Sequence, residues 1–145
     1  MSVDPRTLGW LSRALTHEMS AVQQYLAQSV LARLWGDYAL SSQLRREAVE
    51  ELQHAERLME RLIVLGVAPS AGNLPPARLG RSVEDMLAAD RTLEVDAVRL
   101  YDEAVAHARR MRDSDSVALL EGILAEEVAH VRELDGMSAG HTPHG

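Results

Sequence analysis

The sequence contains the stretch Glu51-Leu52-Gln53-His54, and the same pattern returns as Glu127-Val128-Ala129-His130. Each copy follows a lone glutamate, Glu18 or Glu94, by the same 33 positions, from 18 to 51 and from 94 to 127. Residues three apart lie on one face of an α-helix, so the glutamate and the histidine of each copy can point towards one position in space. Two such helices facing each other, together with the two lone glutamates, would bring four carboxylates and two imidazoles together.

This set of side chains predicts a site for two metal ions. One glutamate from each of two helices, with Glu-x-x-His from each of two others, is the ligand set of carboxylate-rich di-iron and di-manganese sites in four-helix bundles. The chain has no cysteine, so any metal must be held by oxygen and nitrogen. The alternative is a buried salt-bridge network without metal. It explains one Glu-x-x-His well, but two copies at equal spacing poorly.

Helix start and stop signals divide the chain into four long helices. Asp4 followed by Pro5 begins the first helix, Gly36 separates it from the second, and Gly66 supplies a left-handed C-cap to the second. Ser82 and Asp85 begin the third helix by a capping-box-like pattern. The predicted helices cover about residues 5–34, 38–65 and 82–112, and the fourth runs from a capped turn at 113–116 to about 137.

The connections define the topology. Residues 67–81 contain three of the five prolines, so they predict a long extended crossover. Two short turns with one long connection indicate an all-α, antiparallel, ferritin-like four-helix bundle with the crossover between the second and third helices. Glu18 and His54 each lie 18 positions from Gly36, so an antiparallel hairpin places them at the same height.

The candidate ligands lie on the apolar stripes of these helices. In the second helix, the glutamates at 47 and 51 and His54 continue a series that includes Leu44 and Leu58. The other three helices likewise carry carboxylates on their stripes. Burying an unpaired charge is costly, and two divalent cations are an adequate compensation.

Composition limits the remaining choices. A chain of 145 residues with 46% hydrophobic and 26% charged residues predicts a single domain, residues 1–140, with a short flexible tail at 141–145. No apolar run is long enough to span a membrane, and the N-terminus lacks a secretory signal, so we expect a cytoplasmic protein that binds no membrane. A formal charge of −7 argues against nucleic-acid binding.

At these residues the chain resembles the bacterioferritins of the ferritin-like superfamily, over about residues 5–137. The resemblance extends to Tyr25, Trp35 and Gly36 and to the stretches 51–65 and 83–96. It implies two iron ions per subunit, with manganese as an alternative. Terminal ligands would be Glu18 and Glu94, the bridges would be Glu51 and Glu127, and one iron each would be bound by His54 and His130. Tyr25 would be a hydrogen-bonding and redox-active neighbour, or else a core tyrosine with a satisfied hydroxyl.

Three departures from the family pattern affect these expectations. Leu52 stands where bacterioferritins have the methionine that binds haem, so haem of the usual kind is not expected, and Met59 on the same face is more typical of packing. Arg46 and Glu50 stand where the family has an inner-surface histidine and aspartate, which leaves Glu47 as a further candidate ligand. The last residues are too few for the fifth helix of 24-subunit cages. A dimer, a 12-subunit shell and a modified 24-subunit shell all remain open, and the two tail histidines are weak candidate ligands.

The resulting hypothesis is an iron-storage and detoxification ferroxidase that oxidises Fe2+ with O2 or hydrogen peroxide within a homo-oligomer. The alternative is a non-storage di-iron or di-manganese oxidase or peroxidase of the rubrerythrin or catalase type. A third reading, from a different class, is a structural or metal-binding bundle without turnover.

Overall fold

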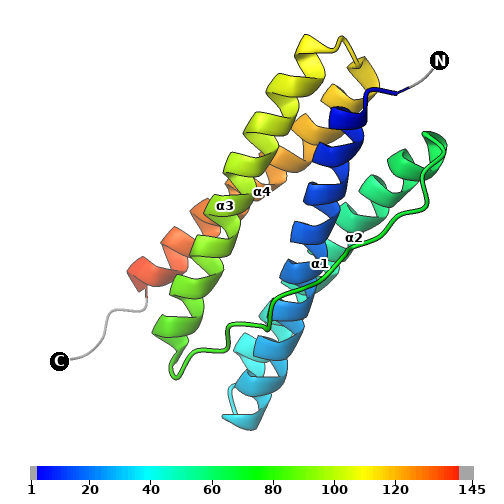
Figure 1. Ribbon diagram of the computed structural model, residues 1–145. Coiled ribbons are helices and arrows are strands. Elements are labelled where there is room, and N and C mark those ends of the chain that lie inside the picture. Colours follow the sequence, from blue (N-terminus) through cyan, green and yellow to red (C-terminus); the bar gives the residue numbers. More distant parts are fainter. Residues whose placement is uncertain (1–2, 141–145) are drawn as a thin grey trace.

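Four long helices lie side by side in the computed structural model, which describes residues 3–140 (Figure 1). They are α1 (Pro5–Leu34), α2 (Tyr38–Val64), α3 (Val83–Arg110) and α4 (Ser114–Gly140), and the described part of the chain contains no strand. α1 packs mainly against α2, and α3 against α4, which gives two antiparallel hairpins. The predicted all-α antiparallel bundle is confirmed. The predicted tail at 141–145 lies outside the described residues.

Most helix ends follow the predicted signals. The Asp4 carboxylate accepts the Arg6 N–H at 2.8 Å, and the Ser82 hydroxyl accepts the Asp85 N–H at 3.1 Å. Gly36 and Gly66 both have φ of +83°, the left-handed conformation expected of glycines that follow helices.

The second hairpin differs from its predicted limits. α3 ends at Arg110, because Arg112 has a φ of +55° and cannot continue a helix. α4 begins at Ser114, earlier than predicted, because the Asp113 carboxylate accepts both the N–H and the hydroxyl of Ser116 and so caps the helix from one residue before it. α4 also continues to Gly140, beyond the predicted end at 137.

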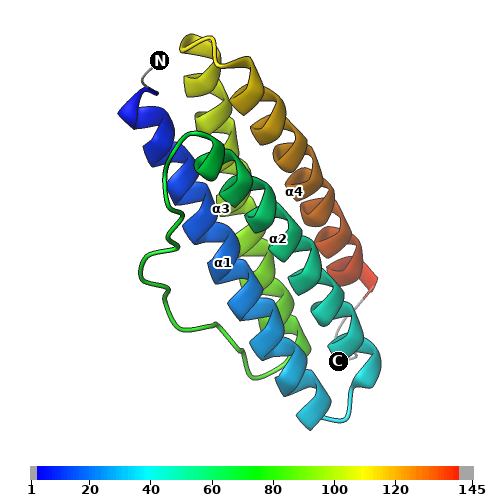
Figure 2. The ribbon, with the colours of Figure 1, turned by 90° about the vertical axis from the view of Figure 1, so that its right-hand side faces the viewer.

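The predicted crossover runs along the bundle from the end of α2 to the start of α3 (Figure 2). Three polar side chains of α1 donate to its backbone carbonyls. Thr16 donates to Ala71 at 2.6 Å, and two glutamines of α1 donate to the carbonyls of Pro75 and Arg78, each at 2.8 Å. These bonds satisfy carbonyls that an irregular segment would otherwise leave unpaired, and they hold the crossover against α1.

Two hydrophobic clusters fill the interior at different heights along the helices. One cluster contains Leu11 and Leu15 of α1 with Leu58 and Leu62 of α2, and α3 and α4 complete it. The other contains Ala21 and Tyr25 of α1 with Leu40, Leu44 and Ala48 of α2 and Met86 of α3. The two Glu-x-x-His stretches and the two lone glutamates lie between the two clusters along the sequence of each helix, so a polar layer separates two apolar regions.

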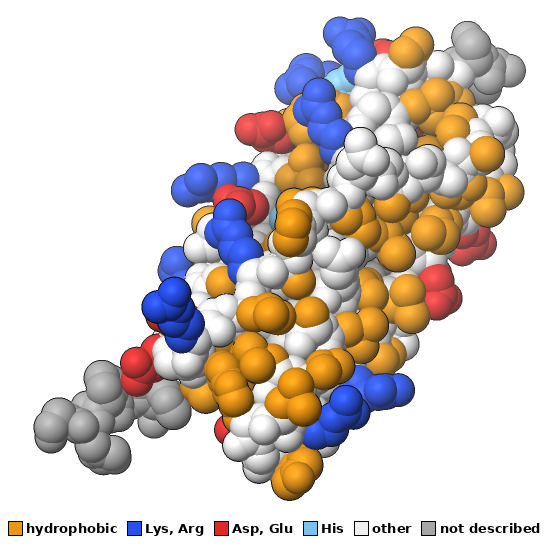
Figure 3. Space-filling view, turned by 60° about the horizontal axis from the view of Figure 1, so that its bottom comes forward, with side chains coloured by type: hydrophobic (Ala, Val, Ile, Leu, Met, Phe, Trp, Pro, Cys, Tyr) orange, Lys and Arg blue, Asp and Glu red, His pale blue; other side chains and the backbone are white. Residues whose placement is uncertain are grey.

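Large hydrophobic side chains also remain exposed at the surface. Figure 3 shows hydrophobic side chains over a broad part of one face of the molecule. The exposed large hydrophobics of α1, α2 and the turn between them, which we call the apolar surface, are Leu26, Val30, Leu34, Trp35, Tyr38, Val49, Leu52, Ile63 and Val64. Exposed apolar patches are typical of surfaces that associate with other proteins.

Candidate metal centre

The structure brings all six predicted ligands together in the middle of the bundle. α1 supplies Glu18, α3 supplies Glu94, and α2 and α4 each supply one Glu-x-x-His pair. None of the six is more than 6% exposed. Fully buried carboxylates are rare unless they are paired or bind metal, so four of them in one layer with two imidazoles require a compensating partner.

The donor atoms fall into two overlapping groups. Glu18, Glu51, His54 and Glu127 form one group, and Glu51, Glu94, Glu127 and His130 form the other, with the donor atoms of each group within 4.8 Å of one another. Glu51 and Glu127 belong to both groups, as two bridging ligands would.

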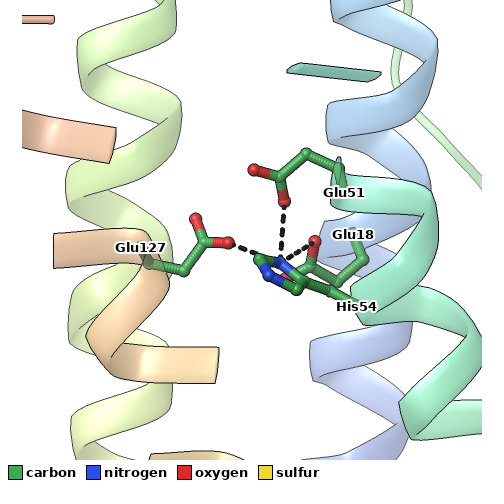
Figure 4. A group of neighbouring side chains, drawn as sticks. All are labelled: Glu18, Glu51, His54 and Glu127. Carbon is green, nitrogen blue, oxygen red and sulfur yellow. Dashed lines mark ion pairs between the residues drawn. The ribbon is translucent and has the colours of Figure 1, made fainter. Parts of the chain in front are cut away.

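The first group is centred on the His54 ring (Figure 4). His54 Nδ1 lies 2.8 Å from Glu127 Oε1, 3.4 Å from Glu51 Oε2 and 3.5 Å from Glu18 Oε2. In the second group, His130 Nδ1 lies 3.0 Å from Glu51 Oε1 and 3.7 Å from Glu94 Oε2. Each imidazole therefore turns the same nitrogen, Nδ1, towards the glutamates of its four-residue group.

Each of the six side chains keeps one buried donor atom that makes no hydrogen bond within the described part of the chain. These atoms are Glu18 Oε2, Glu51 Oε1, His54 Nδ1, Glu94 Oε2, Glu127 Oε1 and His130 Nδ1. Some of these atoms lie close to each other, as His54 Nδ1 and Glu127 Oε1 do, but the geometry of these pairs does not suit a hydrogen bond. A buried polar atom without a partner costs about 1–3 kcal/mol, and more when it is charged. Two cations held by carboxylate and imidazole, a donor set that suits iron and manganese, would satisfy all six.

Two tyrosines fix the orientation of the lone glutamates. The Tyr25 hydroxyl donates to Glu94 Oε1 at 2.7 Å, and the Tyr101 hydroxyl donates to Glu18 Oε1 at 2.6 Å. Burial raises the pKa of both tyrosines well above the usual value, so both remain neutral donors. Each glutamate thus has one oxygen held by a tyrosine, while its Oε2 stays available to a metal.

The sequence analysis identified Tyr25 but missed Tyr101. The signal was present, because Tyr101 follows Glu94 by seven positions, as Tyr25 follows Glu18. Shifting the first hairpin by 76 positions, from 18 to 94, superposes both glutamates, both tyrosines and both Glu-x-x-His stretches. The same shift carries position 50 onto 126, and both of these positions are glutamate.

Burial and mutual repulsion determine how protons are distributed at this centre. Burial raises the pKa of Glu94 to about 7 and that of Glu51 well above its usual value. Burial acts to lower the pKa of His54, but Glu127 and the other nearby carboxylates outweigh it and raise that pKa to about 12. Without metal the centre therefore holds protons, which bound cations would displace.

The surroundings of the centre are less symmetric than its ligands. Glu47 lies beside the His130 end, its Oε2 3.7 Å from His130 Nε2. It is outside both four-residue groups, but it forms a third, partly exposed group of candidate donors with Glu50 and His130. Asp90, fully buried, accepts from Gln24 at 2.9 Å near the same end. The corresponding positions of the other half, 76 residues away, are Ile123 and Ala14, both fully buried. A cavity of about 20 Å³, roughly the space of one water, is lined by both acidic residues and His130.

An antiparallel four-helix bundle with two inward Glu-x-x-His stretches and two inward glutamates defines the class of carboxylate-rich dinuclear metal proteins. Comparison with known proteins agrees with this class. A family model described as a ferritin-like domain matches residues 9–139, so the chain belongs to the ferritin-like family.

Bacterioferritins are among the similar members of that family. The chain is 30% identical to the bacterioferritin of Mycobacterium bovis over 135 residues, which are 93% of this chain and 85% of the relative. It is 33% identical to that of Streptomyces coelicolor over 135 residues, 93% of this chain and 81% of the relative. The resemblance drawn from the sequence is therefore confirmed.

A solved structure supports the same assignment. The Rhodobacter capsulatus bacterioferritin, described as having a metal-free dinuclear site and a haem iron, superposes with a TM-score of 0.92 and 29% identity. The superposition covers 96% of this chain and 87% of that one. Among residues 3–140, no helix combines the length and the apolar character that crossing a membrane requires.

Proposed function

We propose that this protein is a ferroxidase that oxidises Fe2+ to Fe3+ at a dinuclear centre within each subunit and serves iron storage and detoxification. The observation that carries the proposal is the set of six buried donor atoms without hydrogen-bond partners, one on each predicted ligand. The similarity to bacterioferritins supports iron as the metal.

The arrangement of the side chains suggests a role for each. Glu51 and Glu127, which belong to both groups, bridge the two Fe2+ ions, whereas Glu18 and Glu94 each bind one ion through Oε2. The two histidines each bind one ion through Nδ1. Tyr25 acts as a hydrogen-bonding neighbour that holds Glu94. Glu47, at the edge of the centre, contacts only the His130 half of it.

The chemistry requires two electrons and two protons. Two Fe2+ ions each lose one electron, and O2 takes up both electrons with two protons to give hydrogen peroxide. Hydrogen peroxide as the oxidant takes up two electrons and two protons to give two waters. Holding both ions in one centre lets the electrons leave together, which avoids one-electron reduction of O2. The buried position excludes bulk water from the reaction.

Storage requires assembly, and the apolar surface is suited to it. We propose at least a homodimer, with a 12-subunit or a 24-subunit shell as the larger forms that would hold ferric mineral. The formal charge of −7 would attract Fe2+.

Haem does not fit the position where related proteins bind it. Leu52 is a hydrocarbon side chain, 41% exposed on the apolar surface, and it offers no ligand atom. Met59 is packed against the hydrophobic cluster that contains Leu58. We therefore expect purified protein mixed with haem to lack the spectrum of a bis-methionine haem.

The ferroxidase proposal is tested by adding Fe2+ anaerobically, then O2, and following ferric absorbance. The Glu51→Ala and Glu127→Ala double variant should lose fast oxidation, whereas Glu121→Ala, on the exposed side of α4, should keep it. Circular dichroism checks that each variant is folded. Fast oxidation by a folded double variant would refute the proposed bridges.

A second candidate function is a non-storage di-iron or di-manganese oxidase or peroxidase. The observation that favours it is the loss of two family features, since Leu52 replaces the haem ligand and Arg46 replaces an inner-surface ligand. Light scattering coupled to size-exclusion chromatography, with iron measured across the peak, separates the two. A shell holding many iron atoms per chain supports storage, and a dimer holding about two metals per chain supports the oxidase or peroxidase.

A further inference from the structure

The repeat in the sequence extends one residue beyond the predicted metal ligands. Each Glu-x-x-His is preceded by a second glutamate, Glu50 in α2 and Glu126 in α4. Each of these side chains reaches the histidine of the opposite helix. Glu50 Oε2 lies 2.6 Å from His130 Nε2, and Glu126 Oε2 lies 3.2 Å from His54 Nε2.

In each crossed contact a carboxylate faces Nε2 of the ring; the Glu50–His130 contact has hydrogen-bond geometry, and the Glu126–His54 contact is an ion pair. In both histidines Nε2 faces a carboxylate, and Nδ1 faces the glutamates between the helices. A carboxylate that accepts the proton of one ring nitrogen fixes the ring orientation and makes the other nitrogen a better metal ligand. Neither glutamate belongs to the two four-residue groups. Glu50 forms a third group of candidate donors with Glu47 and His130, whereas Glu126 belongs to no such group among the described residues.

The two contacts differ in how the glutamate itself is held. Arg57 Nη1 lies 2.7 Å from Glu126 Oε2, which completes a row of three side chains, Arg57, Glu126 and His54. Glu50 is half exposed, and no arginine within residues 3–140 lies at ion-pair distance from it. The His54 half of the centre is thus supported by a charged partner that the His130 half lacks.

We propose that Glu126 and Glu50 are positioning residues for His54 and His130, and that the support from Arg57 makes the His54 half the tighter of two unequal metal sites. The inference rests on the proposed dinuclear centre and adds an order to its filling. The first divalent cation binds the Glu18 and His54 half, and the second binds the Glu94 and His130 half. Release follows the reverse order.

Anaerobic titration of the chelator-treated protein with Co2+ tests this order, because the visible absorption of Co2+ reports its ligands without redox chemistry. The wild type should bind two Co2+ ions with separable affinities. Glu126→Met, which removes the acceptor at similar volume, should weaken the tighter step by roughly tenfold to a hundredfold. Glu126→Gln, which keeps an oxygen acceptor, should restore part of that loss. Glu50→Met should weaken the other step.

A matched pair of arginine variants isolates the role of Arg57. Arg57→Gln should weaken the tighter step severalfold. Arg91→Gln removes a second ion pair, with Arg91 Nε 2.7 Å from Asp135 Oδ1 and both partners half exposed, that has no connection to a histidine. Arg91→Gln should leave both steps unchanged.

The outcomes separate this inference from the proposed function. The positioning role would be overturned if Glu126→Met and Glu50→Met each bound two Co2+ ions with affinities within twofold of the wild type and with the wild-type absorption spectrum. That result would leave the centre itself intact. A single shared affinity in the wild type, weakened equally by both variants, would overturn the order of filling. Wild-type protein that binds no Co2+ would overturn the centre itself.

Discussion

Removing the hydroxyl of Tyr101 should destabilise the metal-free protein. This hydroxyl donates to Glu18 Oε1 at 2.6 Å, and both side chains are fully buried. The other oxygen, Oε2, already lacks a hydrogen-bond partner. Burial opposes ionisation of Glu18, but the neighbouring Glu51 and His54 outweigh it and lower the pKa of Glu18. Tyr101→Phe therefore leaves a buried, ionised carboxylate in which neither oxygen accepts a hydrogen bond from the described residues.

The expected cost follows from the charge of the acceptor. A hydrogen bond to a charged group contributes about 1.5–3 kcal/mol to stability, and losing one oxygen atom creates little empty volume. We therefore expect the free energy of unfolding to fall by about 1.5–3 kcal/mol. For a chain of this size each kcal/mol lowers Tm by roughly 2–4 °C, so Tm should fall by roughly 3–12 °C.

Urea unfolding at pH 7 with chelator, at one protein concentration, measures the change. Tyr38→Phe is the matched control, because Tyr38 is 69% exposed and its change should stay within about 0.5 kcal/mol. Tyr25→Phe should resemble Tyr101→Phe, since its hydroxyl donates to Glu94 at 2.7 Å. If Tyr101→Phe were as stable as Tyr38→Phe, the buried glutamate would not depend on this donor, and the reasoning about its orientation would be refuted.

Three further predictions address pH, metal and backbone. Burial raises the pKa of Asp90 from 3.8 to about 7. Between these two pH values the folded state holds a proton that the unfolded state has released. The free energy of unfolding should therefore fall as pH rises through this window. Asp90→Asn should make the total fall in the free energy of unfolding across this window smaller by about 2–4 kcal/mol, as measured by urea unfolding of metal-free protein. Zn2+ binding at pH 7 should release at least one proton per chain, because metal-free His54 has a pKa of about 12, and calorimetry in buffers of different ionisation enthalpy measures this release. Gly80→Ala should destabilise the protein by about 1–3 kcal/mol in thermal unfolding, because Gly80 has φ of +80° and a Cβ there would lie 3.0 Å from a backbone nitrogen. The control is Gly9→Ala, in open space on α1, which should be neutral or stabilising.

The fold was predictable because local signals and spacing agreed. Helix caps, two short turns and one proline-rich crossover leave few arrangements of four helices, and the equal distances of Glu18 and His54 from Gly36 fix the register of one hairpin. The limits of α4 were predicted less well. They depend on which residue of the expected turn caps the helix, and the Asp113 side chain caps it from the first position of that turn.

The site was predictable as far as its repeated pattern extends. Glu-x-x-His identifies residues of one helix that share a face, and this property needs no knowledge of the neighbouring helices. The contacts of Glu50 and Glu126 were missed because each crosses to another helix, so they depend on how far apart the helices are and how they are rotated. The same rotation decides that Glu47 lies beside His130 and outside the two groups of ligands.

The polar layer that separates the two hydrophobic clusters has a consequence for folding. The four helices pass through both clusters, but the apolar contacts do not continue across the layer of carboxylates and imidazoles. In the metal-free chain, the two ends of the bundle can therefore open as separate cooperative units, each with its own local free energy of unfolding. Two bridging cations would bind all four helices at the boundary between these units. Metal binding would then make the two ends unfold together as one cooperative unit, so the ions would affect the dynamics of the whole bundle as well as its chemistry.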